Sequence, residues 1–190
     1  MATSLAGRLL VAVPGRLDDP NFRRTVVLML EHGEEGGLGV VLNRPSNTPV
    51  DEPFPGWDEP ASPPRVIFAG GPVQPNMIIA LARTRDGAEL GESWQLVLEQ
   101  SGSRIGTVDL RRHPVDVAPA LECVRVFAGY AGWAPGQLEE ELRLGAWWVV
   151  DPLPWDPFCT DPARLWREVL RRQGGELAIF ALCPDDPSMN

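Results

Sequence analysis

Three short runs of consecutive apolar residues place the strongest constraint on how this chain can fold. They are Arg8–Val13, Thr25–Glu31 and Leu38–Leu42. A strand exposed on one face alternates apolar and polar residues, whereas an unbroken apolar run indicates a strand covered on both faces. With 190 residues, of which 44% are hydrophobic, the chain can bury such a sheet within one domain. We therefore expect a second layer on each side of the sheet.

Further segments predict more strands and a smaller number of helices. One helix begins at Pro162, after the capping residue Asp161, and ends at Gln173 before a glycine. A second covers Pro135–Leu144, and a weaker third covers Asp116–Cys123. The sequence predicts an α/β or mixed α+β fold, with a mixed or mostly antiparallel β-sheet core flanked by helices, in a single compact domain over residues 1–190. The remaining predicted strands are Arg65–Ala69, Met77–Ala82, Trp94–Leu98, Gly106–Leu110, Arg125–Ala128, Ala146–Val150 and Leu177–Leu182.

Proline is concentrated in one part of the chain. Seven prolines fall between Pro45 and Pro64, and each removes a backbone donor. This pattern argues against a regular strand ladder or a long helix, and it predicts a surface excursion pinned by Phe54 and Trp57. The last residues, 184–190, are predicted to be a frayed tail.

Charge excludes several classes of function. The formal net charge is −9, which disfavours direct contact with nucleic acid, because duplex binding needs a positive face. All 17 basic residues are arginine. The absence of lysine excludes Schiff-base catalysis, a phosphate-binding loop lysine and the ion-pairing lysine of protein kinases.

Histidine and cysteine are scarce. The chain has two histidines, and its three cysteines include no C-x-x-C pair, so no usual zinc site can form and we expect neither a metal nor a cofactor. An odd number of thiols fits a reducing compartment, and no apolar run approaches the length that spans a bilayer. These features predict a cytoplasmic protein without a membrane segment.

A hairpin is predicted where Thr25–Glu31 and Leu38–Leu42 flank a glycine-bearing turn. Centring this turn between Glu34 and Glu35 sets Thr25 beside Arg44 and Glu31 beside Leu38. One end of the hairpin then carries two or three arginines with polar neighbours, as in a carboxylate or anion clamp. The alternative is an arginine cluster tied to Asp18 and Asp19 by exposed ion pairs.

Two glycine-bearing segments form the second candidate feature. Gly70-Gly71 follows a predicted strand, and Gly129–Trp133 is interpreted as a turn that leads into the helix near Pro135. Backbone N–H groups at such a turn favour anions, and Tyr130, Trp133 and Gln137 would shape a pocket. The alternative is close packing that only glycine permits.

Nucleophilic catalysis has weaker support. Glu31 and His32 are consecutive in a strand and point to opposite faces, so they do not form a direct acid/base pair. Cys159 or Cys183 could act with His32, but nothing in the spacing requires it, and a buried or idle cysteine is the default.

The sequence resembles the bacterial YqgE/AlgH family over nearly its whole length, and the proline-rich stretch is its main departure. The resemblance implies a compact α/β domain, and it supplies no catalytic residue. Some members are labelled transcriptional regulators, but no helix-turn-helix spacing is present here. The motifs that carry the resemblance are Pro14-Gly15, Asp19–Val26 through Glu31-His32, Gly39–Pro45, Gly70–Val73, Arg125–Trp133 and Gly136–Glu139.

Three functions follow as hypotheses. The first is a non-enzymatic binding protein for a small anionic ligand or for a partner's acidic segment. The alternatives are an indirect regulator that acts through protein contacts and a cysteine-dependent hydrolase or transferase. The composite binding site comprises Arg24, Thr25, Asn43, Arg44, Gly70, Gly71, Gly129, Tyr130, Gly132, Trp133 and Gln137.

Overall fold

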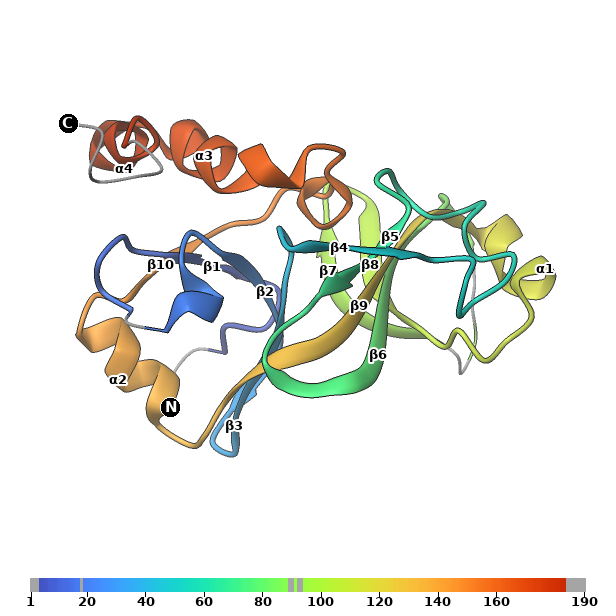
Figure 1. Cartoon of the computed structure of the whole chain (residues 1–190), viewed down its shortest axis with the longest axis horizontal. Helices are drawn as coiled ribbons and strands as arrows, with labels where there is room; N and C mark the ends of the chain where they lie inside the picture. Colours follow the sequence, from blue (N-terminus) through green and yellow to red (C-terminus); the bar gives the residue numbers. More distant parts are fainter. Residues whose placement is uncertain (1–3, 18, 89–90, 92–93, 184–190) are drawn as a thin grey trace.

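A large, mostly antiparallel sheet runs through the chain (Figure 1). The structure is a computed structural model that describes residues 4–17, 19–88, 91 and 94–183, so the prediction for the tail 184–190 lies outside the described residues. The strands are β1 (Leu9–Ala12), β2 (Val26–Gly33), β3 (Gly36–Val41), β4 (Pro45–Pro49), β5 (Val66–Ala69), β6 (Val73–Thr84), β7 (Trp94–Gln100), β8 (Ser103–Val108), β9 (Leu121–Trp133) and β10 (Trp147–Val150).

The strand order places two long strands, β6 and β9, at the centre of the sheet. The order is β10-β1-β2-β3-β9-β6-β8-β7. Off this path, β5 pairs with β9 and β4 pairs with β5, and the β5–β9 pairing is the one parallel pairing among the described strands. The sheet curls: a Cβ added at Gly7, just before β1, would lie 3.3 Å from the carbonyl oxygen of Val97 in β7. The predicted mostly antiparallel sheet core is therefore confirmed.

Helices cover both faces of the β10-β1-β2 part of the sheet, as Figure 1 shows. Leu9 and Val11 belong to a core cluster shared with Leu165 and Trp166, whereas Leu10 and Ala12 pack in another cluster with residues that include Leu138. This alternation explains the unbroken apolar run and confirms burial on both faces. The helices are α1 (Pro114–Val117), α2 (Gln137–Arg143), α3 (Pro162–Gln173) and α4 (Gly175–Phe180), with 3₁₀ helices η1 (Pro20–Phe22), η3 (Ala118–Ala120) and η4 (Asp156–Phe158).

The β2–β3 hairpin confirms the predicted turn and corrects the register beyond it. Glu31 pairs with Leu38 as expected, but a bulge between Met29 and Glu31 shifts the remaining pairs by one residue. Val27 therefore pairs with Val41, and the predicted pairing of Thr25 with Arg44 is wrong. A bulge inserts one unpaired residue into one strand, and the turn sequence gives no sign of it.

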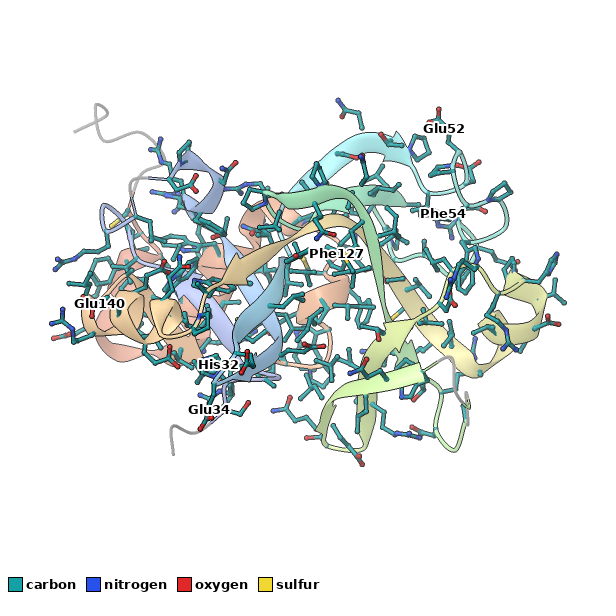
Figure 2. The ribbon with its side chains drawn as sticks, turned by 90° about the horizontal axis from the view of Figure 1, so that it is seen from below. His32, Glu34, Glu52, Phe54, Phe127 and Glu140 are labelled. Carbon is teal, nitrogen blue, oxygen red and sulfur yellow. The ribbon has the colours of Figure 1, made fainter. Side chains whose placement is uncertain are left out.

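The proline-rich stretch is more ordered than its composition predicts. Pro45–Pro49 forms β4, which pairs with β5 at Pro45 and Pro49 only, across an irregularity. An edge strand tolerates proline because one side of its backbone needs no donor. Trp57 is 2% exposed, and Phe54 packs against the same core cluster, so these two side chains anchor the stretch to the core, as predicted. Figure 2 shows Phe54 far from the hairpin end that carries His32.

Three other element predictions are wrong. Leu177–Leu182 was expected to be a strand, but most of it forms α4, because a short apolar run does not distinguish a strand from a buried helix. The predicted helix Asp116–Cys123 breaks into α1 and η3, and β9 has begun by Leu121. Gly129–Trp133 is not a turn, because β9 continues to Trp133 and pairs there with β3.

Candidate functional site

The predicted site residues do not share one cavity in the described chain. Arg24, Asn43 and Arg44 line a cavity of about 500 Å³, which we call the arginine hollow. Tyr130, Gly132 and Trp133 line a second cavity of about 440 Å³, which we call the Tyr130 hollow. The other lining residues of the arginine hollow are Pro20, Arg23, Pro45, Ala163, Trp166 and Arg167. Those of the Tyr130 hollow are Glu31, Glu35, Gly36, Gly37, Leu38 and Val73.

Asn43 and Thr25 position the backbone of the arginine hollow. The Asn43 side chain accepts a hydrogen bond from the N–H of Val26 at 3.0 Å and donates one to the carbonyl of Arg24 at 2.9 Å. The Thr25 hydroxyl is buried and donates to the carbonyl of Phe22 at 2.8 Å. These two polar side chains therefore fix the chain that carries the arginines.

Arg24 lies between α3 and the end of the described chain. Its guanidinium is 5.0 Å from the centroid of the Trp166 ring and donates to the carbonyl of Cys183 at 3.2 Å. The Trp166 indole is itself fixed by a 3.0 Å hydrogen bond to the carbonyl of Ala12. Arg24 has a φ of 53°, a conformation that few non-glycine residues adopt. The surrounding contacts hold this strained residue in place.

Arg44 is half-buried and donates to the backbone carbonyls of Asn43 and Arg23. Desolvation by burial lowers the pKa of its guanidinium. Among the described residues that line the arginine hollow are four arginines and no carboxylate. Asp19 caps η1 by accepting from the N–H of Asn21, and Asp18 lies outside the described residues. The alternative of an arginine cluster tied to Asp18 and Asp19 stays a prediction.

The Tyr130 hollow has the opposite charge. Its described lining includes Glu31 and Glu35 and no basic residue. Gln137, expected to shape the same pocket, instead accepts from the N–H of Ala134 and donates to Glu141. This arrangement favours a cation rather than an anion.

Gly70, Gly71 and Gly129 serve the close packing of the β5–β6 connection against β9. A Cβ at Gly71 would lie 2.1 Å from the carbonyl carbon of Tyr130, and one at Gly70 would lie 2.3 Å from the oxygen of Gly129. Any larger residue would collide with backbone. The packing alternative thus accounts for all three glycines.

The proposed thiol chemistry finds little support in the geometry. His32 accepts from the N–H of Leu5 through Nδ1, and its Nε2 lies 3.2 Å from Glu139, so both ring nitrogens are engaged away from the cysteines. Burial raises the pKa of the Cys159 thiol to about 11, which leaves it protonated at neutral pH. Among described residues, no group of three His, Cys, Asp or Glu side chains could hold a metal ion.

Sequence reasoning missed Arg125, a buried arginine in the middle of β9. It is 1% exposed and donates to the carbonyls of Pro63, Pro64 and Cys159. It stacks 4.2 Å from the Phe68 ring, and burial lowers its pKa to about 10. The sequence signal that could have identified it is a lone arginine within an apolar strand. Its hydrogen bonds join two loops to β9, which indicates a structural role.

The chain is similar to known proteins along almost its full length. A family model described as AlgH-like matches residues 9–178. A UPF0301 protein of Streptomyces coelicolor is 53% identical over 99% of this chain and 96% of its own length, and one of Thermobifida fusca is 50% identical over 98% and 96%.

Two solved structures share the fold. A crystal structure from Corynebacterium diphtheriae matches with a TM-score of 0.85 and 30% identity, covering 96% of this chain and 94% of that one. The solution structure of the AlgH protein from Pseudomonas aeruginosa matches with a TM-score of 0.68 and 29% identity, covering 98% of this chain and 97% of that one.

Each helix within the described ranges is too short or too polar to cross a bilayer.

Proposed function

The chain belongs to the AlgH-like family, and we propose that its arginine hollow binds the anionic group of a small ligand or of a partner's acidic segment. One observation carries the proposal: four arginines line a single hollow in a protein of net charge −9. Arginine is the side chain best suited to carboxylate and phosphate recognition, because its donors form a planar fork.

Arg44 gives this proposal an energetic basis. Its guanidinium is half-buried, and its described hydrogen-bond partners are neutral carbonyls, which offset the cost of desolvating a cation only in part. A guanidinium carries five N–H donors, so an arginine that holds a carbonyl can hold an anion as well. Binding of an anion would therefore add charge-assisted hydrogen bonds where positive charge is already partly desolvated.

The composition of the hollow supports binding rather than catalysis. Its described lining contains no serine, cysteine or histidine, and no acid that could serve as a general base. Trp166 provides a rigid wall, since it is 2% exposed and its indole nitrogen is hydrogen-bonded. A fixed wall and a pinned backbone reduce the conformational entropy lost on binding.

Calorimetric titration tests the proposal with three probes: inorganic phosphate, citrate and a short peptide with consecutive aspartates. The test variant is Arg44→Gln. Its matched control is Arg164→Gln, which removes the same charge from an exposed position of α3 outside the hollow. We expect Arg44→Gln to weaken binding about tenfold, and the control to change it by less than about twofold.

The outcomes separate the two sources of the anion. Saturable binding of phosphate or citrate points to a small ligand, whereas binding of the aspartate peptide alone points to a partner segment. Equal affinities of the wild type and Arg44→Gln, or no binding of any probe, would refute the proposal. The hypothesis of an indirect regulator requires the peptide outcome.

A further inference from the structure

The Tyr130 hollow is built across four strands by the register of the sheet. Glu31 of β2 pairs with Leu38 of β3, which pairs with Gly132 of β9. Tyr130 lies two residues before Gly132, and therefore on the same face, and it pairs with Val73 of β6. The register thus gathers a carboxylate, two apolar side chains, an aromatic ring and a glycine on one face of the sheet.

The hollow is acidic on its polar side and apolar on its floor. Glu35, from the hairpin turn, adds a second carboxylate to that of Glu31, and both residues are exposed at the rim. Leu38 and Tyr130 are partly buried and pack against the main core, so they form a fixed floor. The cavity volume, about 440 Å³, is in the range of small-ligand sites.

Gly132 lets the edge of the Tyr130 ring lie close to the backbone of β9. Its backbone does not have a positive φ, so its conformation does not require glycine. A Cβ at this position would lie 3.2 Å from Cε2 of Tyr130 and 3.6 Å from Cγ2 of Val73, so a side chain there would displace the edge of the ring. The missing side chain thus sets the position of the Tyr130 ring, which lines the hollow.

We propose that the Tyr130 hollow binds an alkylammonium or alkylguanidinium group, with the cation between the two carboxylates and the Tyr130 ring and its alkyl chain against Leu38 and Val73. A cation over an aromatic ring is attracted by the electrons of the ring face, and nearby carboxylates add Coulomb attraction. This site is independent of the arginine hollow and has the opposite charge. It also reverses the sign of the ligand expected at Tyr130 from the sequence.

Tyr130 provides a direct probe because it is the only tyrosine in the chain. Protein labelled with 3-fluorotyrosine gives one ¹⁹F signal, which reports on this ring alone. The probes are L-argininamide and a short peptide with one arginine flanked by apolar residues. A saturable shift with argininamide indicates a small cation as ligand, and saturation with the peptide alone indicates a basic side chain of a partner. Either result supports the site.

Charge variants at the hairpin turn supply the control. Glu35→Gln removes a lining carboxylate, whereas Glu34→Gln makes the same charge change at the adjacent exposed residue, which does not line the hollow. We expect Glu35→Gln to weaken binding roughly two- to fivefold, as for a partly solvated ion pair, and Glu34→Gln to weaken it less.

A third variant, Gly132→Val, displaces the Tyr130 ring from its place in the hollow and should abolish the saturable shift. Its fold is checked by the dispersion of its amide NMR signals. No saturable ¹⁹F shift with either probe, or equal losses in Glu34→Gln and Glu35→Gln, would overturn the proposal. Those results leave the anion titrations of the arginine hollow unaffected, so the two proposals fail separately.

Discussion

Replacing Asp156 with asparagine should destabilise the protein by about 3–5 kcal/mol, the usual cost of breaking a buried ion pair. Asp156 begins η4 and is 1% exposed. Its carboxylate accepts from Arg172 at 2.6 and 2.5 Å and from the N–H of Leu153 at 2.7 Å. An asparagine amide is neutral and offers one oxygen, so Arg172 would be left as a largely buried charge without a counter-ion.

An exposed ion pair on α2 supplies the matched comparison. Glu140 and Arg143 are bridged at 2.6 Å, but their side chains are 54% and 69% exposed. Glu140→Gln should therefore lower the free energy of unfolding far less than Asp156→Asn does, because solvent screens an exposed ion pair. Urea unfolding measures both changes, and a loss of about 3 kcal/mol corresponds to a melting temperature about 6–12 °C lower in a chain of this size.

A second variant isolates the cause. Arg172→Met in the Asp156→Asn background removes the uncompensated charge, so the double variant should be more stable than Asp156→Asn alone. The Asp156–Arg172 pair also fixes the segment between β10 and α3. Trp166 of the arginine hollow lies in α3. A cost for Asp156→Asn below about 1 kcal/mol, or equal to that of Glu140→Gln, would refute this reasoning.

Two other predictions concern packing and thiol chemistry. Gly71→Ala should lower the free energy of unfolding by at least about 3 kcal/mol, because its Cβ would lie 2.1 Å from the backbone of Tyr130. Gly87 has a φ of 71° and open space around it, so Gly87→Ala should lower the free energy of unfolding by only about 1–2 kcal/mol. Urea unfolding compares them, and equal costs would exclude the collision as the cause. Cys159 should react with iodoacetamide near pH 8 about a hundredfold more slowly than a free thiol, because its pKa is about 11 against an ordinary 9.0. Peptide mapping by mass spectrometry reads its rate, and reaction as fast as free cysteine would contradict the burial.

The sequence predicts local structure well where one local signal dominates. The turn between Glu34 and Glu35 fixed the pairing of Glu31 with Leu38, and Pro162 located the first turn of α3, although Asp161 at the N-cap position makes no side-chain capping hydrogen bond. The apolar run of β1 correctly indicated burial on both faces. Each of these results depends on residues within a few positions of one another, so no distant contact was needed to read them.

Prediction failed where a distant contact decided the outcome. The bulge in β2 changed which residue lies beside Thr25. Pairing with β3 extends β9 to Trp133, so Gly129–Trp133 forms part of a strand and not a turn. The composite anion site then divided into two hollows, because Tyr130 faces Glu31 and Glu35 rather than the arginines.

The sequence by itself determined the kind of molecule: an acidic domain with a sheet core, without lysine chemistry, and with arginines gathered at one end of a hairpin. Only the tertiary structure decided the sign of charge in each hollow and which polar side chains position backbone rather than face a ligand. The physical reason is that composition and periodicity reflect forces within one element, whereas a binding site is made by side chains that the sheet register brings together from several strands.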